Sequence, residues 1–312
     1  MARAALAASR AIQIIDFLAA QRATPHSLSE LARALEINLA SCHGILQELT
    51  LTGHLSRHPQ HKTYTLGPVL VAIGEMAGET HDVIARAKAA AAELSRRLKL
   101  EVLLTMRAGD QVLGLAHFNH DVVARAWLRP GVRLPLRPPL GVTFVAWETN
   151  EEIEKWLGRG LSGKLDRATA SKLRALLESV RKRGFQVALK VDLPNEVSGL
   201  SGALDVKRYV EHLDRRLLSA GQDGNLLNFD PAQALDRKSY EIDFISAPVF
   251  DAFDRSIYCM TIYHFDKNMS GRDIKHCVEN LVSTCLSIRR DGSRRPRPTV
   301  SSRRNAISEG GM

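Results

Sequence analysis

The spacing of apolar residues predicts two short adjoining helices followed by a β-hairpin near the start of the chain. Apolar side chains recur every three or four residues from Leu28 to Leu35 and from Cys42 to Leu49, which is the period of an amphipathic helix. Residues 36–38 alone separate the two segments, and two β-like segments then flank a His-Pro-Gln-His turn. A tight joint between two helices, followed by a ribbon, indicates a winged helix-turn-helix whose second helix enters the DNA major groove.

The second helix and the hairpin carry the side chains that we expect to touch DNA. Gln47 can bond an adenine edge in bidentate fashion, and Ser41 and His43 can bond a base edge or a phosphate. Arg57 and Lys62 on the hairpin are the expected phosphate contacts. The predicted DNA-binding residues are Ser29, Asn38, Ala40, Ser41, His43, Gly44, Gln47, Arg57, Lys62 and Tyr64.

Apolar periodicity also predicts the helices and strands of the rest of the chain. A helix over residues 9–20 precedes the helix-turn-helix and should bury Ile12, Ile15 and either Leu18 or Ala19. We call the predicted DNA-binding region, residues 1–67, the head. A linker helix over residues 69–76 follows the head. Further helices are predicted at residues 84–98, 151–157, 166–183 and 270–290, and strands at 102–106, 111–118, 124–128, 185–189, 241–250 and 256–265. Since helices and strands do not alternate regularly, we predict an antiparallel α+β domain after the head.

Several of these stretches resemble a known family. The segment LSELARALEINLASCHGILQELTLTGHL, the wing that ends in YTLGPVL and the late hairpin EIDFISAPVFDAFDRSIYCMTIY are similar to stretches of the IclR (isocitrate lyase regulator) family of bacterial transcription factors. The chain departs from the family at Glu36, where relatives usually carry Gly, and at Gly44, where they often carry Arg. Gly inside a helix costs about 1 kcal/mol relative to Ala, and the missing Arg removes an expected DNA contact.

The resemblance implies a transcription regulator controlled by a small molecule. It implies a homodimer or homotetramer that binds a palindromic operator in double-stranded DNA, with the first helix helping to pair two heads. It also implies a C-terminal, GAF-like antiparallel-sheet domain that binds the effector. Matched residue by residue, the family's pocket-lining positions fall on Ile242, Phe244, Thr261 and Tyr263.

A second stretch, GVRLPLRPPLGVTFVAW, resembles the loop-to-helix corner that borders the family's pocket, after a one-residue deletion. It adds Arg137, Leu140 and Gly141 to the expected effector-binding residues. The acidic pair that relatives tend to carry on a later strand is replaced here by Ala188 and Leu189. We therefore expect an apolar, aromatic-walled pocket with few polar anchors, suited to an aromatic or aliphatic organic acid.

Two interpretations of these positions remain open. At the corner, Arg137 and the amides after Gly141 receive a carboxylate, or Pro138 and Pro139 only stiffen a surface loop. On the hairpin, the side chains line a ligand pocket, or they fill it and the domain serves only oligomerisation.

The expected organisation is a head (residues 1–67), a linker helix (68–80), an effector-binding and oligomerisation domain (81–290) and a disordered basic tail (291–312). The domain contains an insertion at residues 191–240, where the family has a short loop. It includes a predicted helix over residues 205–219. A long insertion in a compact domain usually has a function, so we hypothesise a lid or an extra oligomer contact.

The net charge of +9 is concentrated outside the head. From Arg289 onward the chain has seven Arg against two acidic residues, whereas residues 1–78 hold six Lys and Arg against five Asp and Glu. A composition of 45% hydrophobic and 25% charged residues is ordinary for a globular protein. The sequence has no membrane-length apolar run and its first twenty residues lack a signal-peptide core, so we expect a cytoplasmic protein with no membrane partner.

Other functional classes find little support. The sequence has no G-x-S-x-G, H-E-x-x-H or Walker motif, so we expect no enzyme, no catalytic residues and no cofactor. The alternative is a metal or redox sensor that uses His54, His58, His61 and Cys42. Those His residues lie on a wing turn, and Cys42 should face the core, so no metal site is predicted. The four cysteines lack C-x-x-C spacing and are expected to be reduced core thiols.

Overall fold

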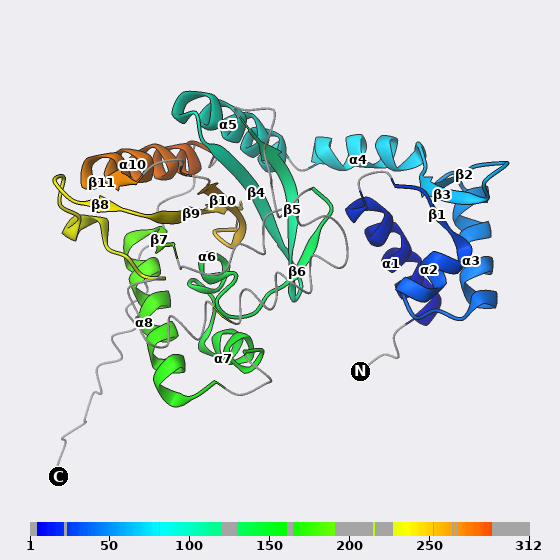
Figure 1. Cartoon of the computed structure of the whole chain (residues 1–312), viewed down its shortest axis with the longest axis horizontal. Helices are drawn as coiled ribbons and strands as arrows, with labels where there is room; N and C mark the ends of the chain where they lie inside the picture. The colour runs from blue at the N-terminus through cyan, green and yellow to red at the C-terminus, as the bar shows by residue number, and fades with distance from the viewer. Residues whose placement is uncertain are drawn as a thin grey trace, which may run out of the picture.

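A small N-terminal head and a larger α+β domain are joined by one helix, α4 (Val69–Thr80) (Figure 1). The computed structural model describes residues 5–21, 24–80, 82–119, 130–160, 165–190, 215, 227–251, 253–263, 265 and 268–288. No helix within these ranges is long and apolar enough to cross a membrane.

The head is a winged helix-turn-helix, as predicted. It comprises α1 (Leu6–Ala20), α2 (Leu28–Ala34), α3 (Leu39–Leu51) and a sheet of order β1 (His26–Ser27), β3 (Thr63–Leu66), β2 (Leu55–Arg57). A capping box between Ser27 and Glu30 starts α2. On α1 the buried residues are Ile14 and Leu18, while Ile12 is 56% exposed, so the prediction that Ile12 is buried was wrong. Contact with α3 and β3 selects the buried face of α1.

The second domain is built on one six-stranded antiparallel sheet. Its strand order is β6 (Arg133–Pro135), β5 (Gln111–Phe118), β4 (Glu101–Ala108), β10 (Ser256–Tyr263), β9 (Ile242–Phe250), β7 (Gln186–Leu189). A short η3 turn (Pro231–Gln233) precedes β8 (Ser239–Tyr240), which pairs with β11 (Met269–Ser270). The predicted α+β class with an antiparallel sheet is confirmed.

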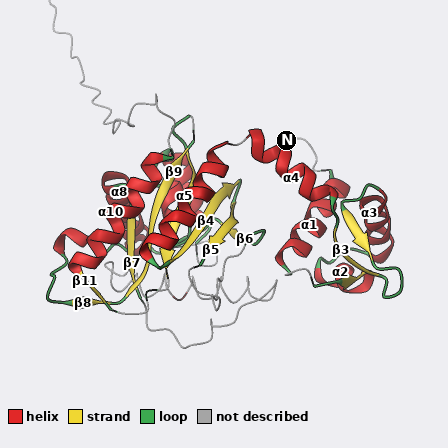
Figure 2. Ribbon diagram, turned by 90° about the horizontal axis from the view of Figure 1, so that it is seen from above, coloured by secondary structure: helices red, strands yellow, loops and turns green. Residues whose placement is uncertain are grey.

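Helices cover both faces of this sheet. α5 (Asp82–Leu98) and α10 (Gly271–Ser287) pack together on one face (Figure 2). The predicted apolar stripe of α5 faces inward, since Ala87, Ala91 and Leu94 are fully buried. The other face carries α6 (Val142–Val145), α7 (Asn150–Gly158) and α8 (Arg167–Arg183) over a second core cluster that includes Trp156 and Phe144.

The chain leaves the sheet after β7 and returns beside the same strand. The side-chain amide of Gln186 donates to the Leu227 carbonyl (3.0 Å), and the Phe229 N–H donates to the Val187 carbonyl (3.1 Å). Arg183 donates to the Phe229 carbonyl (3.2 Å) and so holds the same segment. The predicted strand at 124–128, the predicted helix at 205–219 and the basic tail lie outside the described residues, as does most of the insertion.

Candidate functional site

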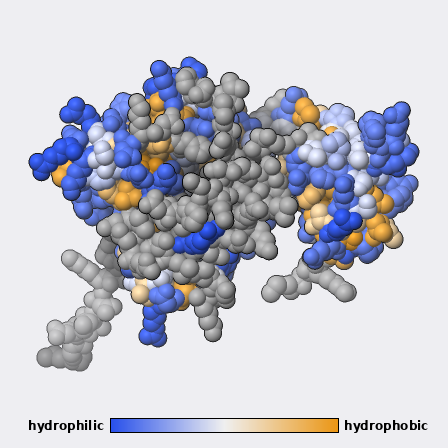
Figure 3. Space-filling view, viewed as in Figure 1, coloured by the Kyte–Doolittle hydropathy of each residue, from blue (hydrophilic) through white to orange (hydrophobic). Residues whose placement is uncertain are grey.

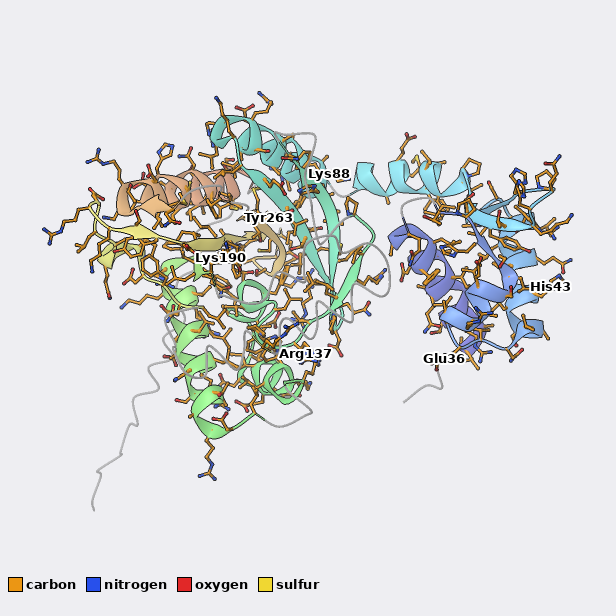
Figure 4. The ribbon with its side chains drawn as sticks, in the orientation of Figure 1. Glu36, His43, Lys88, Arg137, Lys190 and Tyr263 are labelled. Carbon is orange, nitrogen blue, oxygen red and sulfur yellow. The ribbon has the colours of Figure 1, made fainter. Side chains whose placement is uncertain are left out.

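The outward face of α3 is open and carries polar side chains between two exposed leucines, Leu39 and Leu51. Cys42 and Leu46 are fully buried, whereas Ala40, His43, Gly44 and Gln47 are exposed. His43 points away from the second domain (Figure 4). A helix with one uncovered face that carries polar side chains can lie in the major groove, where an amide side chain can read adenine.

The residues at the helix starts have local roles. The Asn38 side chain accepts a hydrogen bond from the Ser41 N–H (2.8 Å), which caps α3. Ser41 is half-buried beside this cap. Ser29 is exposed at the start of α2, where its hydroxyl lies 3.2 Å from that of Ser27.

The three residues predicted to contact DNA from the wing differ in their exposure. Arg57 and Lys62 are exposed, but Tyr64 is 4% exposed and belongs to the core of the head. Strand pairing puts Tyr64 opposite Arg57, whose guanidinium carbon lies 5.8 Å from the centre of the tyrosine ring. The prediction of Tyr64 as a DNA contact is therefore corrected, because its ring faces inward beside Leu55.

Three of the predicted effector-binding residues share the sheet surface under α6, which we call the α6 face. Register pairs Tyr263 with Phe244 and Glu101, and Thr261 with Leu103 and Ser246. Ile242 does not join them, because the register of β9 against β7 shifts between Ile242 and Phe244. Ile242 packs in the α5 and α10 cluster instead, which corrects the expectation that it lines the same wall.

The α6 face is more polar than the sequence predicts. His117 Nε2 lies 3.0 Å from Glu101 Oε2, and the two side chains are 13% and 11% exposed. The His117 ring stacks on that of Tyr263 at 5.9 Å, and burial together with the negative charge of Glu101 raises the pKa of the tyrosine. Glu101 and His117 were not among the predicted site residues; the available signal was an ionisable residue beside the apolar runs at residues 102–104 and 112–116.

The loop-to-helix corner closes over this face. Gly141 has φ +90°, and a Cβ at that position would lie 2.1 Å from a Leu136 methyl carbon, so the corner requires glycine. The Leu140 carbonyl accepts a hydrogen bond from the Trp156 indole (2.9 Å), and the Thr143 hydroxyl donates to Cys259 Sγ (3.1 Å).

The same corner contains Arg137, which is half-buried (Figure 4). Desolvation lowers the pKa of its guanidinium. All four residues of α6 are buried, so the amides after Gly141 do not face bulk solvent.

No group of three or more His, Cys, Asp or Glu side chains in the described ranges is arranged to hold a metal ion. On the wing, the ring centres of His58 and His61 lie 4.5 Å apart with the ring planes tilted by 38°, and Cys42 is buried in the head.

Two family models match this chain and divide it between the head and the second domain. The IclR helix-turn-helix domain matches residues 7–59, and the bacterial transcriptional regulator IclR C-terminal domain matches residues 76–191. The chain belongs to the IclR family of bacterial transcriptional regulators. A curated relative, the HTH-type transcriptional regulator XynR of Escherichia coli, is 27% identical over 180 residues, covering 56% of this IclR chain and 71% of XynR.

Solved structures share the fold of this IclR-family protein along most of its length. An IclR regulator from Alicyclobacillus acidocaldarius has a TM-score of 0.66 at 18% identity, covering 92% of this chain and 98% of its own. Pseudomonas aeruginosa HmgR has a TM-score of 0.57 at 21% identity, covering 91% and 97%. An IclR homologue from Microbacterium hydrocarbonoxydans, complexed with 4-hydroxybenzoate, has a TM-score of 0.57 at 17% identity, covering 90% and 97%.

Proposed function

We propose that this IclR-family regulator binds its operator through α3 and that a small molecule bound at the α6 face changes its operator affinity. The observation that carries the proposal is the pairing of two features in one chain. One is an open helix face in the head that exposes His43 and Gln47; the other is a buried sheet face that holds Glu101, His117 and Tyr263. Linkage requires the ligand to bind the DNA-competent and DNA-incompetent states with different affinity.

The effector that we propose is an aromatic or aliphatic organic acid. Tyr263 and Phe244 offer aromatic surface, and Arg137 offers a positive charge at the corner. The structural neighbour that binds 4-hydroxybenzoate supports this class of molecule. The domain binds its ligand without transforming it, in keeping with a family of regulators. The alternative is that side chains fill the α6 face and the domain serves only assembly.

We also propose that the protein works as a homodimer or homotetramer on a palindromic site. Exposed apolar side chains of the head and linker helix support such an assembly (Figure 3). They are Leu6 and Ile12 on α1, and Val71, Ile73 and Met76 on α4. The division into a head (1–67), linker (68–80) and effector domain (81–290) is part of this proposal.

Fluorescence anisotropy tests whether the protein prefers its operator to other DNA. The purified protein is titrated into labelled duplexes of the gene's own upstream region and of a scrambled sequence, at moderate salt. Gln47→Ala should weaken binding to the upstream duplex by about 1–3 kcal/mol, the usual value of a bidentate base contact. The matched control is Gln13→Ala on the exposed surface of α1, which should leave affinity unchanged. Equal affinity of the wild type for both duplexes would contradict the proposal.

The same titration, repeated with a panel of aromatic and aliphatic acids, tests the effector. The expected result is a ligand-dependent change in operator affinity that Tyr263→Phe alters. If none of these acids changes either the operator affinity or the thermal stability, the result favours the alternative in which side chains fill the α6 face and the domain serves only assembly.

A further inference from the structure

The head and the second domain meet at an ion pair. Arg133 Nε lies 2.7 Å from Asp16 Oδ2, and the two side chains are 28% and 31% exposed. Asp16 is on α1, between Ile14 and Leu18, which are buried in the core of the head. Arg133 is on β6, which pairs with β5 at the edge of the large sheet.

A close backbone contact accompanies the ion pair. Gly131 has φ +87°, and a Cβ at this position would lie 3.0 Å from the Cβ of Ala19. Ala19 and Asp16 are three residues apart on α1, so both contacts use one turn of the helix. We call these two contacts, Asp16–Arg133 and Ala19–Gly131, the α1–β6 latch.

The latch is connected to the corner that covers the α6 face. Immediately after β6, the Leu136 N–H donates to the Asp110 carbonyl (2.8 Å) and the Leu136 carbonyl accepts from Arg159 (3.2 Å). The Leu136 side chain packs against Gly141 with no room for a Cβ between them. A displacement of the corner therefore has a well-packed route along β6 to Arg133. Packed groups of this kind move between discrete arrangements and do not absorb a displacement gradually.

On the other side, the latch is connected to the DNA-reading helix. α1 packs on α3 within the head, so a change in the docking of α1 changes where α3 lies. We propose that the α1–β6 latch couples occupancy of the α6 face to the placement of the reading helix. This inference rests on the proposed function for its biological meaning, but the docking itself is testable without DNA or ligand.

Charge reversal tests the docking. The variants are D16R, R133D and the double variant D16R/R133D, and hydrogen exchange is followed at residues 6–20 and 131–135. Each single variant should speed exchange at both segments by roughly two- to fivefold, the range for a partly exposed ion pair, and the double variant should restore it. The matched control is the swap E154R/R174E, which exchanges an ion pair within the second domain and should leave both segments unchanged.

A second variant tests the Ala19–Gly131 contact of the latch. Ala19→Leu keeps both charges but adds bulk against Gly131, and it should reproduce the effect of the single charge variants. Two results would overturn the docking. One is that the effects of D16R and R133D on exchange add in the double variant; the other is that Ala19→Leu leaves the exchange rate at residues 131–135 unchanged.

Operator titrations of the same variants test the coupling. The single variants should shift the ligand-free operator affinity by about the same two- to fivefold factor, and the double variant should restore it. If the wild type prefers its operator and the docking is verified by exchange, unchanged affinity in all variants would overturn the coupling. An absence of operator preference in the wild type would instead refute the proposed function, while the exchange measurements still decide the docking.

Discussion

Glu36 adopts a backbone conformation that favours glycine. Its φ is +53°, in the turn between α2 and α3, and its side chain is exposed (Figure 4). A left-handed conformation costs a residue with a Cβ about 1–2 kcal/mol, and part of this is offset by the greater unfolded-state entropy of glycine. We expect Glu36→Gly to raise the free energy of unfolding by about 0.5–1 kcal/mol, measured by urea denaturation. Glu36→Ala keeps the Cβ and should give no such gain; an equal gain would assign the cost to the side chain instead.

Gly44 leaves open space on the exposed side of α3. A Cβ at this position would meet nothing within 4 Å, so larger side chains fit. Gly44→Arg should strengthen operator binding and steepen its salt dependence by about one unit of log–log slope, because one more phosphate is neutralised. The control is Gly44→Ala, which should stabilise the helix by about 1 kcal/mol and leave the salt slope unchanged. A slope that does not differ between the two variants would show that the new charge does not reach DNA.

The four cysteines are poor nucleophiles in this fold. All are buried, and burial raises the pKa of Cys277 to about 11 and that of Cys42, Cys259 and Cys285 above the usual value. Thiols with raised pKa stay protonated at neutral pH, and the thiolate is the reactive form. The native protein should react slowly with a disulfide reagent at pH 8, and all four thiols should react after unfolding. A rapid reaction of one thiol in the native state would revive the redox-sensor alternative.

At the scale of elements, α10 begins with a capping box whose strength depends on pH. The Ser270 hydroxyl and N–H both donate to the Asp273 carboxylate (2.7 and 3.2 Å), and these two bonds lower the pKa of Asp273. A lowered folded-state pKa means that the stabilisation is present above the unfolded pKa and is lost as pH falls through the folded one. Asp273→Ala should therefore be less stable than the wild type at pH 7, and the difference should shrink below about pH 4. The measurement is the urea midpoint of both proteins between pH 7 and about pH 3. A difference between the two midpoints that does not change with pH would show that the carboxylate charge is not involved.

Local periodicity predicted most elements correctly, because it reports which side of an element is buried. Ala87, Ala91 and Leu94 follow the helical repeat and are buried as expected. The errors occur where packing between distant parts of the chain decides which side chains are buried. The neighbours of α1 bury Ile14 in place of Ile12, and an irregularity in the pairing of β9 turns Ile242 to the opposite face.

The candidate site was predicted less completely for the same reason. Phe244, Thr261 and Tyr263 could be placed on one face by strand alternation and family resemblance. Strand register brings His117 to Glu101, sixteen residues apart, and that register is not visible in either segment. Asp16 and Arg133 come together only when two domains dock.

At the scale of the whole molecule, exposed apolar residues on α1 and α4 argue for assembly. Val71 and Met76 are 64% and 61% exposed on the helix that joins the two domains. Large exposed apolar side chains in a group usually mark an interaction surface. Met76→Asp combined with Val71→Asp should reduce the mass measured by light scattering after size exclusion. Phe253→Asp, at another exposed apolar residue, is the control and should keep the wild-type mass; an unchanged mass in the α4 variant would place the interface elsewhere.

The arrangement at β7 bears on how this architecture can diversify. The chain departs after Leu189 and is back beside the same strand by Leu227, so both positions lie at one edge of the sheet. In general, doubling the length of a flexible connection between two fixed ends adds only about 0.6 kcal/mol of closure entropy. A longer connection between these two positions is therefore compatible with the same register of the six strands, which makes this edge a position where a protein of this fold can acquire new segments.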